Sequence, residues 1–250
     1  MKHKLRKELT RKETMQFMDR RLLRYGFIIS FLLIACLLPL RGESAQSNRH
    51  AVLIDPAHGR EDTGVVADKL REKDLTLNLA LKVREESQKG ENLLVRLTRS
   101  TDRAMSIAER IKMAGDFRPE CLISLHVNAG FGKQAGGYEV YFPGFRQNGS
   151  REEGSTPVLK DMAKNRSLNE SVRLAQAIQT ALDTVFPRKG RGLRDAPSPL
   201  LSGVTIPGLV VEVGFATNPE ERKSLTREDT QRAIARALVK GLREYFLKTP

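Results

Sequence analysis

The chain has 250 residues, of which 40% are hydrophobic and 29% charged, and its formal net charge is +13. This composition is ordinary for a globular protein with enough apolar material for a core. The basic excess favours nucleic acid, an anionic membrane surface or an acidic polymer as partner. The sequence has no helix-turn-helix, no zinc-finger spacing and no arginine-rich run with aromatics, so nucleic acid is excluded from the expected partners. The two cysteines, Cys36 and Cys121, provide neither a disulfide framework nor a cysteine-based metal site.

Residues 1–40 combine a basic head with a short apolar run. Nine Lys/Arg and three Asp/Glu precede residues 26–40, and those fifteen residues carry no charge. The pattern predicts an export signal, because the run is short for a membrane span. The route stays open between a lipoprotein box at Cys36, a twin-arginine signal at Arg20 and Arg21, cleavage near Ala45, and an uncleaved anchor. Each alternative places the rest of the chain, from about Gln46 onward, outside the cytoplasm, in the periplasm or cell envelope.

Residues 41–50 are polar and turn-rich and are predicted to form a linker, which leaves residues 51–250 as one domain of the usual size. Within this domain, short apolar runs alternate with longer segments of helical pattern. Strands are predicted at 51–54, 93–97, 121–125, 138–142 and 209–215, and helices at 75–88, 104–114, 167–185 and 229–246. Strands that alternate with helices predict an α/β domain built in layers.

Several helix ends and loops are also predicted. Asp74, the Ser167–Glu170 capping box and the Thr226–Asp229 pair are expected to cap helices. Residues 143–166 are expected to be irregular, and residues 188–202 to form a basic loop broken by glycine and proline.

Four ionisable residues of this domain stand out. His58 and His126 each follow a predicted buried strand, and Glu212 lies inside an apolar strand. A single histidine after a strand is more often structural, and an ion pair with an arginine would explain a buried glutamate. Glu72 lies in a loop before a helix and would ordinarily be solvated. Three His/Glu ligands and a further carboxylate as general base are nevertheless what a catalytic zinc site requires, although no compact HExxH motif is present.

The sequence from Val52 to Phe246 resembles the zinc-dependent N-acetylmuramoyl-L-alanine amidases of the amidase-3 type, which hydrolyse bacterial cell walls. Separate blocks carry the resemblance in the same order along the chain. They are Ile54–Gly59, Glu72–Asp74, Leu97–Arg99 with Asp102, Ser124–Ala129, Gly137–Tyr141, Arg191–Leu193, and Pro207–Phe215 with Asn218.

The resemblance implies one zinc ion per chain, with His58, Glu72 and His126 as ligands and Glu212 as the catalytic carboxylate. It implies a twisted mixed β-sheet flanked by helices on both faces. The reaction implied is hydrolysis of the amide bond between N-acetylmuramic acid and L-alanine of the peptidoglycan stem peptide. The alternatives are an envelope zinc peptidase that cuts within the stem peptide and a non-catalytic wall-binding module.

Three further residues are given roles near this site. Asn128 is expected to orient the substrate, and Asp55 to hold the ring of His58. Arg194, in the predicted basic loop, is expected to meet carboxylates of the stem peptide; a merely solvated loop is the alternative.

Two features differ from the family pattern. Ala57 stands where the family usually has glycine. Some members insert a long helix after the GYEVY strand, and this helix plugs the zinc until a partner withdraws it. Here residues 143–166 are shorter and broken by glycine, which favours the absence of a full plug; contact of Glu152, Glu153 or Asp161 with the site stays open. An activator or divisome protein stays open as a partner, as does membrane contact through residues 26–40.

Overall fold

The structure is a computed structural model, and it describes residues 49–144, 155–186 and 190–248. The described residues belong to one compact unit, Asn48–Pro250. The predicted export segment, with Cys36, lies outside the described residues, and so do Glu152 and Glu153. Within the described part of the chain, no helix is long and apolar enough to cross a membrane.

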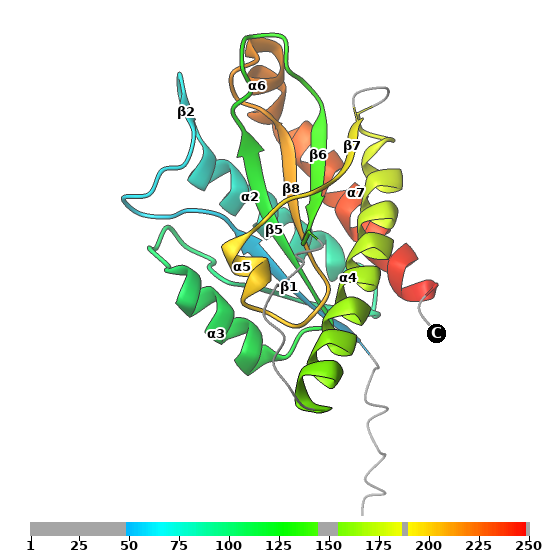
Figure 1. Cartoon of the computed structure of the whole chain (residues 1–250). Coiled ribbons are helices and arrows are strands. Elements are labelled where there is room, and N and C mark those ends of the chain that lie inside the picture. Colours follow the sequence, from blue (N-terminus) through cyan, green and yellow to red (C-terminus); the bar gives the residue numbers. More distant parts are fainter. Residues whose placement is uncertain (1–48, 145–154, 187–189, 249–250) are drawn as a thin grey trace, which may run out of the picture. The chain divides into compact units, whose positions relative to one another are not determined.

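Six strands form the central sheet, in the order β4-β1-β5-β8-β6-β7 (Figure 1). Four of them run parallel, whereas β6 and β7 run in the opposite direction, so the sheet is mixed, as expected. A short antiparallel hairpin, β2 with β3, lies outside this sheet. The strands are β1 (His50–Pro56), β2 (Val66–Ala67), β3 (Leu70–Arg71), β4 (Leu93–Leu97), β5 (Cys121–Asn128), β6 (Tyr138–Phe142), β7 (Gly190–Asp195) and β8 (Gly208–Phe215).

Helices cover both faces of this sheet, which confirms the predicted α/β layered fold. The helices are α2 (Glu72–Ser87), α3 (Ile107–Phe117), α4 (Ser155–Leu182), α5 (Pro199–Ser202), α6 (Pro219–Leu225) and α7 (Glu228–Leu247). Helices α2, α4 and α7 contribute to the main core, while α3 and α5 pack on the other face in a smaller cluster (Figure 1).

The alternation of side chains along β5 shows how the two faces differ. Cys121, Ile123, Leu125 and Val127 point into the main core and are buried. Between them, Leu122 joins the smaller apolar cluster, and the following residues on that face are polar: Ser124, His126 and Asn128. The same face therefore changes from apolar to polar toward the carboxyl end of the strand.

Three of the predicted helix caps are wrong. Helix α2 begins at Glu72, and Asp74 lies inside it, paired with Arg71. Carbonyl groups of the preceding loop cap α2 instead, because the amides of Glu72 and Lys73 donate to the oxygens of Val65 and Thr63. Ser167 lies in the interior of α4, and no side chain caps α7 at Arg227. A capping pattern is local, so it does not exclude a helix that runs through it.

Several elements were not predicted from the sequence, among them the short strands β2 and β3. The first turns of α4 occupy 155–166, part of the segment expected to be irregular. Strand β7 and helix α5 lie in the predicted basic loop, since the sequence of β7, GRGLRD, has no apolar alternation. Helix α6 has a sequence signal that was overlooked, because Asn218 caps it and Pro219 follows directly. His50, assigned to the linker, is the first residue of β1.

Candidate active site at the carboxyl edge of the sheet

The first functional side chain, His58, lies two residues beyond the end of β1. Three successive residues there have positive φ angles: 63° at His58, 140° at Gly59 and 55° at Arg60. Gly59 is required at this turn, because a Cβ would collide with the carbonyl oxygen of Arg103. The ring of His58 is oriented by Asp62, whose Oδ1 lies 2.8 Å from Nδ1, and this leaves Nε2 facing Glu72.

Glu72 is the first residue of α2, and its carboxylate is almost fully buried. Its Oε2 lies 3.1 Å from His58 Nε2 and accepts a hydrogen bond from the amide of Val65. Its Oε1 lies 3.0 Å from His126 Nδ1 and accepts a hydrogen bond from the amide of Val127. Burial opposes ionisation, but the hydrogen bonds from both histidines and from the two amides hold the pKa of Glu72 well below its usual value. The carboxylate is therefore charged.

His58, Glu72 and His126 form a group that could bind a metal ion. One ligand atom from each residue lies within 4.8 Å of the others. Two imidazole nitrogens and a carboxylate oxygen are the donor set of catalytic zinc sites. The backbone makes room for this group at Gly64, where a Cβ would come within 2.5 Å of Glu72 Oε2 and 2.7 Å of His58 Nε2. The residues present therefore fit a metal ion.

Glu212 lies beside this group, as expected from the sequence. It is the register partner of His126 on the neighbouring parallel strand β8. Its Oε2 is buried and has no hydrogen-bond partner among the described residues. The pKa of Glu212 is raised to about 7, chiefly by burial; the charges of Glu72 and Glu139 contribute to this rise, and those of His126 and His58 oppose it. A buried carboxyl group with a free oxygen and a pKa near neutrality is suited to accept and return a proton.

The predicted partner of His58 is wrong. Asp55 lies within β1, and its carboxylate accepts hydrogen bonds from Thr98 Oγ1 at 2.6 Å and Ser124 Oγ at 2.7 Å and pairs with Arg110. These contacts tie β1 to its two neighbouring strands and to α3, and the His58 ring is held by Asp62. Asp62 could not be distinguished from an ordinary turn residue in the sequence, because only the folded loop brings it back to the ring.

Asn128 and Arg194 lie on the same face of the sheet as Glu212, and both contact a residue that was not singled out from the sequence, Glu139. Asn128 Nδ2 donates to Glu139 Oε2 at 2.8 Å, and Arg194 Nη2 lies 3.5 Å from Glu139 Oε1. Tyr141 donates its hydroxyl to the same carboxylate at 2.6 Å. Glu139 is buried and is the register partner of Glu212 in the antiparallel pair of β6 and β8. The signal that identified Glu212, a carboxylate inside a strand, was also present at Glu139.

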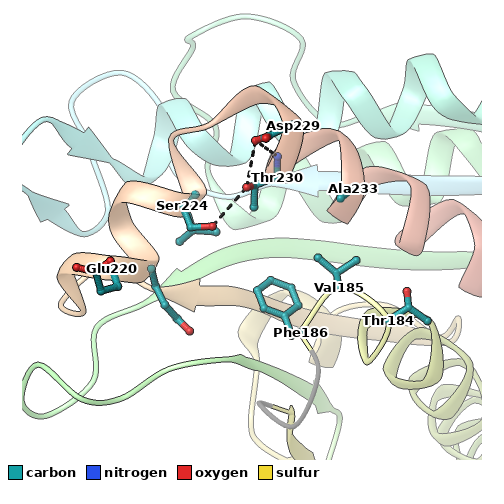
Figure 2. Close-up of a pocket in the computed structure, with 10 residues that line it drawn as sticks. Thr184, Val185, Phe186, Glu220, Ser224, Asp229, Thr230 and Ala233 are labelled. Atoms are coloured by element: carbon teal, nitrogen blue, oxygen red, sulfur yellow. Dashed lines mark hydrogen bonds between the residues drawn. The ribbon is translucent and has the colours of Figure 1, made fainter.

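A separate cavity of about 600 Å³ lies near the start of α7 and contains none of these residues. Figure 2 shows Val185 and Phe186, after the end of α4, across from Ser224, Asp229 and Thr230. Its lining combines apolar and acidic side chains without a histidine. The convergent ligands, and the buried Glu212 with its raised pKa, are at the carboxyl edge of the sheet, so the candidate active site is placed there.

A mixed sheet with this group of donors and a buried carboxyl beside it is the arrangement of a metal-dependent hydrolase of the α/β class. The profile of the Amidase_3 family, described as N-acetylmuramoyl-L-alanine amidase, matches residues 52–244. The chain therefore belongs to the N-acetylmuramoyl-L-alanine amidase family of peptidoglycan hydrolases, which confirms the resemblance.

Relatives and solved structures agree with this assignment. The germination-specific N-acetylmuramoyl-L-alanine amidase of Bacillus subtilis (strain 168) is 30% identical over 224 residues, covering 84% of this chain and 82% of that protein. AmiC of Escherichia coli O6:H1 is 25% identical over 233 residues, and this chain spans only 55% of its length. The catalytic domain of CwlV from Bacillus (Paenibacillus) polymyxa var. colistinus superposes with a TM-score of 0.66 at 26% identity, over 80% of this chain and 99% of that domain.

Proposed function

We propose that this chain hydrolyses the amide bond between N-acetylmuramic acid and L-alanine of the peptidoglycan stem peptide, with a zinc ion held by His58, Glu72 and His126. The observation that carries this proposal is the free, buried Oε2 of Glu212 beside three convergent ligands. The chemistry that zinc supplies when bound is Lewis acidity, which polarises the amide carbonyl and lowers the pKa of a bound water toward about 7.

Glu212 acts as the general base and then as the general acid. Its carboxylate takes the proton of the attacking water as the new bond between oxygen and carbonyl carbon forms. The same proton passes to the nitrogen of L-alanine as the carbon–nitrogen bond breaks, so the peptide leaves as a free amine and the muramic acid gains a carboxyl group, which ionises in water. The raised pKa of Glu212, about 7, suits both halves of this transfer.

The remaining polar residues on this face bind and orient the substrate. Asn128 and Arg194 are both held by Glu139, next to Glu212. The Arg194 side chain is half exposed, so its guanidinium can meet a carboxylate of the stem peptide while it stays paired with Glu139. Asp62 holds the tautomer of His58 that presents Nε2 to the metal.

The setting of this reaction is the cell envelope, where peptidoglycan lies. The basic head and apolar run of residues 1–40 then act as the export signal or as a membrane anchor through residues 26–40, with lipidation at Cys36 as one route. An activating protein is a further proposed partner. A structural neighbour, the CwlD amidase from Clostridioides difficile, was solved in complex with the GerS lipoprotein.

Digestion of purified peptidoglycan by the full-length chain tests the proposal. We expect mass spectrometry to find intact stem peptides released from glycan, a chelator to abolish release, and added zinc to restore it. Peptides cut internally would instead identify a peptidase. Binding to peptidoglycan without any release in the zinc-loaded state would identify a wall-binding module and overturn the proposed reaction.

A further inference from the structure

Two buried arginines contact the backbone segment that carries His58. Where β1 ends, the carbonyl groups of three successive residues accept hydrogen bonds from arginine side chains. Arg110 donates from Nη1 to the oxygen of Pro56 at 3.1 Å and from Nη2 to the oxygen of His58 at 2.9 Å. Arg99 donates from Nε to Pro56 at 3.0 Å and from Nη2 to Ala57 at 2.8 Å.

Arg99 also reaches the second candidate ligand. The same Nη2 donates to the carbonyl oxygen of Lys73, the residue after Glu72, at 2.8 Å. Thr76, on the next turn of α2, donates its hydroxyl to Ala57 at 3.1 Å and to Lys73 at 3.3 Å. One guanidinium and one hydroxyl thus join the loop of His58 to the first turn of α2, which carries Glu72.

The backbone conformation that these hydrogen bonds hold is energetically unfavourable by itself. His58 and Arg60 have positive φ angles, which residues other than glycine adopt at a cost, and such conformations persist only where the surroundings impose them. Arg99 and Arg110 are 2% and 6% exposed. Among the described residues, the hydrogen bonds of Arg99 go to backbone oxygens and to Thr76 alone, so its buried charge holds backbone geometry rather than a carboxylate.

We propose that Arg99 and Arg110, together with Thr76, are positioning residues that fix His58 against Glu72 in the geometry that binds the metal. The planar fork of arginine donates from separate nitrogens in a fixed geometry, which lysine, with a single donor nitrogen, cannot reproduce. The inference rests on the proposed function, because it concerns the same metal site, but it assigns residues that touch neither metal nor substrate.

Zinc affinity of the full-length chain tests the proposal, measured by competition with a chromogenic chelator at a temperature where circular dichroism shows every variant folded. We expect Arg99→Lys and Arg110→Lys to bind zinc about 10- to 100-fold more weakly, as is typical when the supports of metal ligands are removed. Thr76→Val keeps the shape of the side chain and should weaken binding severalfold. When the variants are saturated with zinc, kcat should fall by a smaller factor than zinc affinity does.

Gln231→Ala is the matched control, because it removes a buried side chain that donates to a carbonyl, that of Leu225, and, among the described residues, makes no hydrogen bond with the ligand group. It should lower stability and leave zinc affinity unchanged. Unchanged affinity in the arginine variants would overturn the positioning role. If those variants do not fold, Thr76→Val decides, and wild-type affinity would count against the role. Failure of the wild-type chain to bind zinc would instead contradict the proposed function itself.

Discussion

The two faces of the sheet contrast in what they bury. The face under α2, α4 and α7 is apolar along the whole length of the central strands. The opposite face is apolar only beside α3 and α5, where Leu53 and Leu122 lie. Toward the carboxyl ends of β5 and β8, that face carries His126 and Glu212, and Glu139 lies beside Glu212 near the start of the antiparallel strand β6. One face therefore supplies most of the hydrophobic stabilisation. The other face buries ionisable side chains, at a cost in stability, because these side chains form the candidate site.

Adjacent residues of β8 give the sharpest test of this contrast. Glu212→Gln should lower the rate of peptidoglycan hydrolysis roughly 10²- to 10⁴-fold, because the proton acceptor is lost while the shape is kept. Val211→Ala, one residue away on the apolar face, should cost about 2 kcal/mol of stability and leave the activity of the folded fraction unchanged. Release of soluble peptide and urea denaturation measure the two effects. Similar activity losses in both variants would break the comparison.

The pH dependence of stability is a second difference between the two faces, because the polar face buries an ionisable group, Glu212. Burial raises the pKa of Glu212 from 4.5 to about 7, so folding favours its neutral form, and the stability linked to it is present below pH 4.5 and is lost as the pH rises through 7. In the presence of a chelator, Glu212→Gln should gain about 3 kcal/mol relative to wild type between about pH 4 and pH 8. Urea titrations at both pH values measure this gap. A gap that does not change with pH would contradict the buried, protonated state.

The backbone under the ligands is the third point of contrast. Gly64 and Gly132 both have positive φ angles, but only at Gly64 would a Cβ meet His58 and Glu72. Both alanine variants should lose about 1 kcal/mol of stability. Gly64→Ala alone should weaken zinc binding, by about tenfold or more, because it displaces two ligands. Chelator competition checks this, and equal zinc affinity in the two variants would show that the space at Gly64 is unimportant.

The smallest expected effect is at the rim of the polar face. Arg194→Ala should raise KM for peptidoglycan fragments by up to about fivefold with little change in kcat, since a half-exposed charge contributes about 1 kcal/mol or less. The control is Arg232 of α7, a similarly exposed arginine that pairs with Glu85 of α2 and with Glu228 of α7. A fall in kcat alone, or the same KM shift in Arg232→Ala, would contradict a substrate-binding role for Arg194.

Much of the fold and of the ligand group was predictable, because the signals are local. Buried strands are visible as apolar runs, and strands 93–97 and 138–142 have the predicted bounds. His58, His126 and Glu212 were conspicuous as ionisable residues at the ends of such strands or inside them. The fit of Glu72 to this group depended on the family resemblance, since nothing local distinguishes it from a solvated glutamate.

The features that escaped prediction depend on contacts between distant segments. Asp62 reaches His58 only because the loop folds back. Asp55 has its role because Thr98, just after β4, and Ser124, on β5, flank it. Strand β7 carries no apolar alternation and pairs with β6 as the outermost strand of the sheet. The register that places Glu139 opposite Glu212 is likewise set by the sheet rather than by either strand alone.

The position of the chain ends has a practical consequence. His50, at the start of β1, stacks on Phe246 near the end of α7, with ring centroids 4.0 Å apart. Strand β1 spans about 20 Å between this contact and the turn of His58. The first and last described residues therefore lie near the end of the sheet opposite the candidate active site. A linker attached at either of these positions starts about one strand length away from the candidate site, the site that a cross-linked polymer would have to approach.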